Sequence, residues 1–316
     1  MATYNGERFL SEQIDSILAQ DYANVRVLAR DDGSDDGTAA ILEEYASRFP
    51  ERFRVMPSSP GTGHPKWNFL RLMEASTAEY VCFADQDDVW LPQKLSMTMQ
   101  AMKRLEARYG RELPLLAFTD LRVVNEQLET QHESYWKLHR MNPRQANHFA
   151  RLLGQNVVTG CTAMLNRPLL KMALRMPDEA EMHDGWTALL AAAFGASEPV
   201  LTQTMLYRQH CHNILGAAKP EPQLKVPKLR HHQERQKRWQ MSERQAKALL
   251  RIHGAELMAD KRRILEAFVQ CGESGNRLSR IGTALRHGFY VPWVRNNLSM
   301  LWYLWDLKAA KVTPQK

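Results

Sequence analysis

Over its first 210 residues, the chain alternates short apolar runs with amphipathic stretches. This alternation is typical of strand–helix units and predicts an α/β fold, in which a mostly parallel sheet is flanked by helices. The runs expected to form strands are Val25–Ala29, Arg54–Met56, Tyr80–Ala84, Leu115–Thr119, Val157–Leu165 and Val200–Leu206. Apolar residues at helical spacing predict helices over Phe9–Leu18, Ala40–Phe49, Trp67–Ala75, Pro92–Arg108, Arg144–Leu153 and Trp186–Phe194.

The charge of the chain differs between its two parts. Residues 1–218 hold 22 Lys+Arg against 27 Asp+Glu, whereas residues 219–316 hold 20 against 8. We therefore predict an acidic α/β domain over residues 1–218 and a basic, helical extension over residues 219–316, which opens with a proline-rich linker. A basic extension can contact an anionic partner, either membrane lipid or nucleic acid, or it can be a solvated helical face.

Aromatic and leucine residues gather over residues 289–305, and the cations Arg286, Arg295, Lys308 and Lys311 flank them. Such a cluster can lie in the interface plane of a bilayer, and it can equally be a helix that docks on the rest of the protein. No apolar run reaches the roughly 18 residues that a membrane-spanning helix needs. With four scattered cysteines and no secretion signal at the start, the sequence predicts a soluble protein of a reducing compartment.

Two carboxylates, Asp31 and Asp32, follow the strand expected over Val25–Ala29 and open the segment Asp31–Thr38. The carboxyl ends of parallel strands face the crevice in which such sheets bind ligands. There, a carboxylate can accept hydrogen bonds from the N–H and hydroxyl groups of a nucleoside. The alternative is a glycine-rich turn whose acidic side chains only cap the next helix.

Three more carboxylates, Asp85, Asp87 and Asp88, follow the strand expected over Tyr80–Ala84. Carboxylates so close in sequence repel one another in a low-dielectric cleft, and a shared divalent cation relieves that repulsion. Carboxylate oxygens suit Mg²⁺ or Mn²⁺, and such a cation would bridge to a diphosphate. The alternative is a solvated acidic turn before the helix expected from Pro92.

In this order and about fifty residues apart, the two acidic segments resemble those of glycosyltransferase family 2, whose GT-A fold has a nucleotide-binding sheet. The resemblance covers about residues 1–215 and is closest to the rhamnosyltransferase-like branch. It rests on Ala2–Gly6, Asp31–Thr38, Lys66–Phe69, Asp85–Pro92, Met182–Trp186 and Tyr207–His210. The family begins with a hydrophobic strand before its Thr-Tyr-Asn-Gly segment, so for a chain that starts at Met1 we expect this strand to be missing or truncated.

The resemblance implies an inverting, metal-dependent glycosyltransferase of the hexosyltransferase type. Asp184 matches the carboxylate that serves the family as general base, although an aspartate at this place is also typical of a helix N-cap. The implied ligands of the divalent cation are Asp85, Asp87, Asp88 and His210. The implied donor-binding residues are Thr3, Asn5, Asp31, Asp32, Lys66, Asn68, Asp85 and Arg208.

The same branch implies transfer of rhamnose from dTDP-rhamnose to a saccharide or lipid-linked saccharide, in the synthesis of lipopolysaccharide or another cell-surface polysaccharide. Such an acceptor places the protein in the cytoplasm, with its basic extension in peripheral contact with the anionic inner face of the membrane. The segment Gly160–Met164 is expected to line the acceptor pocket or to be simply a buried strand.

Two other classes of protein compete with this interpretation. A nucleotidyltransferase that makes activated sugars also has an α/β sheet and metal-binding carboxylates. Such an enzyme is expected to show a glycine-rich phosphate loop with a basic residue near its first strand. The sequence has no such loop. A non-catalytic module could bind a nucleotide, or nucleic acid through residues 225–263. Few aromatic residues accompany the cations there, so no nucleic-acid partner is expected.

Overall fold

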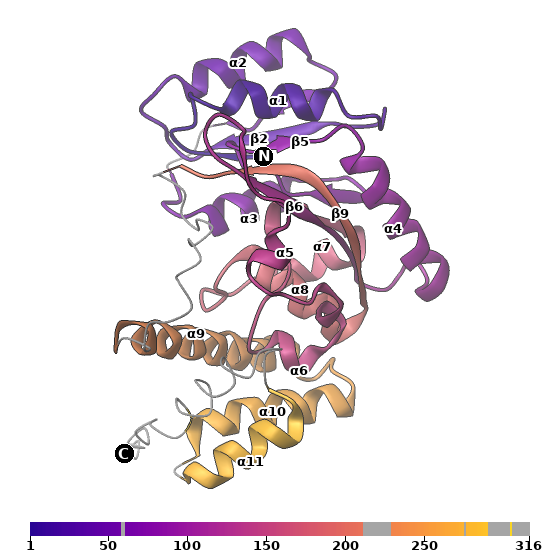
Figure 1. The fold of residues 1–316 in the computed structure, drawn as a ribbon. Helices are drawn as coiled ribbons and strands as arrows, with labels where there is room; N and C mark the ends of the chain where they lie inside the picture. The colour runs from indigo at the N-terminus through magenta and orange to yellow at the C-terminus, as the bar shows by residue number, and fades with distance from the viewer. Residues whose placement is uncertain (58–60, 211–228, 275, 290–303, 305–316) are drawn as a thin grey trace.

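The computed structural model describes residues 1–57, 61–210, 229–274, 276–289 and 304 (Figure 1). The proline-rich linker predicted after residue 218 lies outside these residues, as does most of the aromatic cluster predicted over residues 289–305. In the described part of the chain, no helix is long and apolar enough to cross a membrane.

The amino-terminal strands form a parallel sheet in the order β1-β2-β3. Figure 1 shows α1 and α2 on one side of these strands and α3 on the other. Gln13, Ile14 and Ile17, whose spacing predicted the first helix, are buried. The elements are β1 (Ala2–Thr3), α1 (Leu10–Leu18), β2 (Val27–Asp31), α2 (Thr38–Arg48), β3 (Phe53–Val55) and α3 (Pro65–Ala75). The first strand, β1, has two residues.

A second sheet has the order β4-β8-β6-β9-β5, and β7 pairs with β6. Its long central strands β6 and β9 are parallel, whereas β8 pairs antiparallel with both of its neighbours. The strands are β4 (Tyr80–Cys82), β5 (Val89–Trp90), β6 (Leu115–Val124), β7 (Thr130–His132), β8 (Ala163–Asn166) and β9 (Ala196–Arg208). The predicted α/β fold is confirmed. Strand β8 is the end of the apolar run Val157–Leu165, and its antiparallel direction was not predicted.

The helices of this part are α4 (Lys94–Tyr109), α5 (Tyr135–Leu138), the 3₁₀ helix η1 (Pro143–Asn147), α6 (Phe149–Leu152), the 3₁₀ helix η2 (Gly160–Thr162), α7 (Arg167–Ala173) and α8 (His183–Phe194). The helix predicted from Pro92 begins two residues later, after a turn. The helix predicted over Arg144–Leu153 was wrong as one element. His148 breaks it, because the Asn147 side chain is tied by two hydrogen bonds to the backbone of Ser197 in β9.

The strand predicted over Val157–Leu165 is also shorter than expected. Residues 155–159 form a loop, Gly160–Thr162 is a 3₁₀ turn, and only Ala163–Asn166 pairs in the sheet. Val157, Val158 and Cys161 are buried, although they form no strand pairing in the sheet. The apolar run therefore reflects the burial of the loop and the 3₁₀ turn as well as of the strand. Burial alone does not distinguish a strand from a buried loop.

The basic extension is helical, with α9 (Leu229–His253), α10 (Ala259–Glu273) and α11 (Arg277–His287). Figure 1 shows these helices at the end of the molecule opposite α1 and α2. Trp239 of α9 and Phe268 of α10 belong to the same buried apolar cluster as Trp186 of α8. Phe289 and Leu304 belong to the aromatic and leucine cluster predicted over residues 289–305, but both are buried in the apolar cluster of Trp186. The expectation that they lie in a bilayer interface is therefore wrong for these two residues.

Candidate active site

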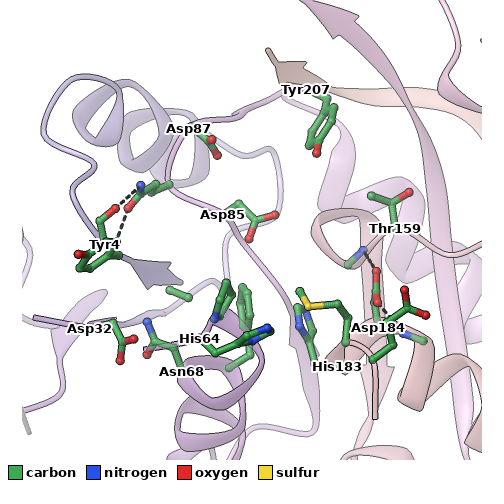
Figure 2. Close-up of a pocket in the computed structure, with 18 of the residues that line it drawn as sticks. Tyr4, Asp32, His64, Asn68, Asp85, Asp87, Thr159, His183, Asp184 and Tyr207 are labelled. Carbon is green, nitrogen blue, oxygen red and sulfur yellow. Dashed lines mark hydrogen bonds between the residues drawn. The ribbon is translucent and has the colours of Figure 1, made fainter. Parts of the chain in front are cut away.

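A cavity of about 1270 Å³ opens at the carboxyl ends of β1, β2 and β4. Its opposite wall consists of the loop before η2, the start of α8 and one face of α9. Figure 2 shows Asp85 near the middle of this cavity, with Tyr4 and Asp32 on one side and Thr159 and Asp184 on the other. Ligand crevices of α/β sheets lie at this end of the strands.

The cavity brings together eight side chains that the sequence indicated as candidates. They come from six separate segments of the chain, between the first strand and the end of the second sheet. The eight are Thr3, Asn5, Asp32, Asn68, Asp85, Asp87, Asp184 and His210.

Asp32 holds the loop that forms one rim of the cavity. Its carboxylate accepts hydrogen bonds from the Thr62 backbone N–H at 2.7 Å, from the Gly63 N–H at 3.0 Å and from Arg30 Nη1 at 2.8 Å. Burial acts to raise the pKa of Asp32, but these hydrogen bonds outweigh it and hold the pKa below its usual value. A Cβ at Gly61 would lie 2.3 Å from the Asp32 carbonyl oxygen, so this close approach requires glycine.

Asp31 has a different place from the one predicted, because it does not line the cavity. It accepts hydrogen bonds from the Ser34 N–H at 2.8 Å and from Thr3 Oγ1 at 3.0 Å. Asn5, in the left-handed region at φ 49°, meets the same turn, since its N–H donates to Ser34 Oγ at 2.8 Å. The buried Asp31 therefore stabilises the turn that carries the neighbouring cavity residues, and the donor contact implied for it stays a prediction.

Lys66 and Arg208 also lie outside the cavity lining. Lys66 Nζ donates to the carbonyl oxygens of Asp178 and Ala180 at 2.9 and 2.7 Å. Arg208 Nε donates to the Asp87 carbonyl oxygen at 2.8 Å. Both cations are buried and donate to backbone carbonyls of loops next to the cavity, so they support the site, and the donor binding that the resemblance implied for them stays a prediction.

The acidic segment after β4 has the residues of a cation site. Carboxylate oxygens of Asp85 and Asp88 and the Cys161 sulfur lie within 4.8 Å of one another. Asp88 is fully buried, and its Oδ2 has no hydrogen-bond partner among the described residues. Burial, together with the charges of Asp87 and Asp184, raises the pKa of Asp85 to about 7. A divalent cation would offset this repulsion, so the residues present fit such a group.

Asp87 points into the cavity from the same segment. Its Oδ2 lies 2.8 Å from Nε2 of His210, which follows β9 by two residues. Because His210 also lines the cavity, the structure joins the carboxylate and the imidazole that the sequence suggested as cation ligands, although 123 residues separate them.

Asp184 lies in the first turn of α8, across the cavity from Asp32 (Figure 2). Its Oδ1 accepts from the Gly185 N–H at 2.6 Å, and its Oδ2 accepts from the Gly160 N–H at 3.0 Å. Burial outweighs these bonds and raises the pKa of Asp184 to about 6. The N-cap of α8 is Met182, so the alternative of an aspartate N-cap is corrected. Each carboxylate oxygen can still accept one more hydrogen bond.

The cavity lining also includes residues that were not predicted, among them His183 and three residues of α9. His183 precedes Asp184 in the Met182–Trp186 segment, and that position was the only available signal. Arg238, Ser242 and Gln245 of α9 also line the cavity, and Gln245 Oε1 accepts from the Glu181 N–H at 3.0 Å. No local pattern could have found the α9 residues, because they reach the cavity only through the packing of the extension on α8.

Comparison with known proteins places these observations in a family. The family model described as Glycosyl transferase family 2 matches residues 1–172. The dTDP-rhamnosyl transferase RfbG of Shigella flexneri is 28% identical over 229 residues, which is 69% of this chain and 74% of that protein. The Escherichia coli UDP-Glc:alpha-D-GlcNAc-diphosphoundecaprenol beta-1,3-glucosyltransferase WfgD is 32% identical over 102 residues, which is 32% of this chain and 39% of that one.

Solved structures agree on the fold. Residues 1–349 of Staphylococcus aureus TarS superpose with a TM-score of 0.57 at 16% sequence identity, covering 95% of this chain and 76% of that one. The same protein in complex with UDP-GlcNAc gives 0.57 at 17% identity, over 96% and 85% of the two chains. The GT-A fold is thereby confirmed. The family match also favours a glycosyltransferase over the nucleotidyltransferase and the non-catalytic binding module considered above. The family model matches more than half of the 316 residues of this chain, and the chain therefore belongs to glycosyltransferase family 2.

Proposed function

We propose that the protein transfers rhamnose from dTDP-rhamnose, with inversion at the anomeric carbon, to a hydroxyl of a lipid-linked saccharide during synthesis of lipopolysaccharide or another cell-surface polysaccharide. The observation that carries this proposal is the convergence of Asp32, Asp85 and Asp184 on one cavity. The similarity to RfbG supports the choice of donor, and the similarity to WfgD supports a lipid-linked acceptor.

The donor would lie with its nucleoside against Thr3, Asn5, Asp32 and Asn68 and its diphosphate near Asp85. Mg²⁺ or Mn²⁺, held by Asp85, Asp87, Asp88 and His210, would supply positive charge for the diphosphate as it leaves. Arg208 and Lys66 contribute by holding the loops that carry these groups, as their hydrogen bonds to backbone carbonyls indicate.

Asp184 would act as the general base. An acceptor hydroxyl attacks the anomeric carbon from the side opposite the diphosphate, the bond to the diphosphate oxygen breaks, and the hydroxyl proton passes to Asp184. A pKa of about 6 suits this task, since the carboxylate is ionised at neutral pH and more basic than an exposed aspartate.

The α/β domain and the helical extension would then form different parts of the active site. Residues 1–218 would carry the donor site and the base, and residues 219–316 would complete the acceptor side. Support for this division comes from α9, whose Arg238 and Ser242 line the cavity on the side of Asp184.

The donor is tested by thermal unfolding of the full chain with Mn²⁺ and a panel of nucleotide-sugars. A ligand at about one hundred times its Kd stabilises the folded state by about 2.7 kcal/mol, which for a chain of this size raises Tm by several degrees. We expect dTDP-rhamnose to give the largest rise and to exceed dTDP alone, which is the control for nucleotide binding. A larger rise with a UDP-sugar would contradict the choice of donor.

We further propose that the extension contacts the anionic inner face of the cytoplasmic membrane through α11. Leu278 and Leu285 are 71% and 56% exposed, and their spacing of seven residues places them on one helix face. The exposed Arg277 and Arg286 lie next to these leucines in sequence. Exposed leucines framed by cations are typical of helices that lie in a membrane interface.

The L278D/L285D double variant is expected to bind phosphatidylglycerol vesicles at least about tenfold more weakly, because each leucine that leaves water contributes about 1.5–3 kcal/mol. Vesicle co-sedimentation of the full chain measures this. Leu201→Asp is the matched control, because Leu201 is 60% exposed but lies on β9. Equal binding by the double variant and the wild type would contradict contact through α11.

A further inference from the structure

His183 has no hydrogen-bond partner for either ring nitrogen among the described residues, although it is only 4% exposed. It lines the cavity beside Asp184, whose two oxygens both accept hydrogen bonds. Buried polar atoms in native proteins are almost always paired, and an unpaired one requires an explanation. At the wall of a substrate cavity, the ordinary explanation is a partner that arrives with the ligand.

The ring of His183 is held in place by its neighbours. Its centroid lies 4.1 Å from that of Phe69 and 4.5 Å from that of Phe83, with the Phe83 ring edge-on. A Cβ at Gly160 would lie 2.8 Å from His183 Nε2, so the third side of the ring is closed by a glycine backbone. An imidazole fixed in this way is preorganised for one binding geometry.

The chemistry of this imidazole selects the kind of group that it can bind. Burial lowers the pKa of His183 to about 3, so the ring is neutral, with one N–H donor and one nitrogen acceptor. A neutral ring with both functions matches a hydroxyl, which also donates and accepts, better than it matches a phosphate, which calls for positive charge. Sugar hydroxyls are the groups of this kind that a nucleotide-sugar offers next to its diphosphate.

The position of the ring indicates which part of the donor it meets. In Figure 2, His183 lies below Asp85 and beside Asp184, between the carboxylate expected near the diphosphate and the expected base. The sugar that is transferred must occupy this interval, because its anomeric carbon reacts there. We propose that His183 binds a hydroxyl of the transferred sugar and thereby orients the donor and selects among sugars; this inference rests on the proposed glycosyl transfer.

His183→Phe separates this role from a structural one. A phenyl ring keeps the aromatic contacts with Phe69 and Phe83 and removes two unpaired polar atoms, so we expect its Tm to stay close to that of the wild type. The affinities for dTDP-rhamnose and dTDP are compared by calorimetry with Mg²⁺. We expect about three- to tenfold weaker binding of dTDP-rhamnose, the effect of one neutral hydrogen bond, and unchanged binding of dTDP. His183→Gln, which keeps a donor and an acceptor, is expected to bind dTDP-rhamnose more tightly than the Phe variant does.

The outcomes distinguish the inference from the function on which it rests. If another nucleotide-sugar of the panel stabilises the wild type most, the comparison uses that sugar and its nucleoside diphosphate. A sugar-to-nucleotide affinity ratio that is the same in wild type and His183→Phe would overturn the role of His183 and leave the transferase function standing. A wild type that binds no nucleotide-sugar would refute the proposed function, and the inference with it.

Discussion

Asp184→Asn is expected to lower kcat at least about a hundredfold while leaving the affinity for the nucleotide-sugar within about twofold of wild type, since general-base groups contribute on that scale. The amide cannot take the acceptor proton, but it is close in shape to the carboxylate beside Gly160 and Gly185. Steady-state transfer with saturating donor measures the first quantity, and calorimetry measures the second.

The pH dependence tests the same assignment independently. Asp184 acts in its ionised form and has a pKa of about 6, so kcat/KM of the wild type should fall about tenfold per unit as the pH drops below about 6. Asp184→Asn should lack this acidic limb. Glu181→Gln is the matched control, because Glu181 also lines the cavity and precedes Asp184 by three residues. Near-normal turnover in purified Asp184→Asn, or loss only in Glu181→Gln, would remove Asp184 as the base.

Removal of the divalent cation with EDTA is expected to lower activity at least about a hundredfold, and added Mg²⁺ or Mn²⁺ should restore it. The departing diphosphate gains negative charge in a cavity already lined by Asp85 and Asp87, so uncompensated departure is strongly disfavoured. Asp87→Asn should give a loss of similar size, because it weakens the cation site that Asp87 shares with His210.

The dependence on a divalent cation can also be measured by thermal unfolding, with a charge control. The rise in Tm caused by the nucleotide-sugar should require the cation in the wild type and should shrink in Asp87→Asn. Asp35→Asn is the matched control for charge, since Asp35 is an exposed carboxylate of the other acidic segment. Unchanged activity after thorough chelation would refute dependence on a cation, whatever the variants do.

The sequence alone was sufficient for the fold class and for the end of the strands at which the cavity lies. Val27–Asp31 and Tyr80–Cys82 form strands close to where apolar runs predicted them, and acidic residues follow both. Such predictions succeed because helix and strand periods, and the position of a residue just after a strand, depend on neighbours in the chain. Contacts between distant segments carry no such local signal, which is why the antiparallel pairing of β8 and the break at His148 were missed.

The same division applies to the site. Residue types and their positions after strands indicated Asp32 for a nucleotide and Asp85 for a cation, and the family resemblance of Met182–Trp186 indicated Asp184 as the base. Only the tertiary structure decided that Asp31, Lys66 and Arg208 support loops, that α9 forms a cavity wall, and that His183 keeps both ring nitrogens unpaired among the described residues. The physical reason is that a side chain's role depends on which partners occupy its polar atoms, and packing of segments far apart in the chain decides which partners those are.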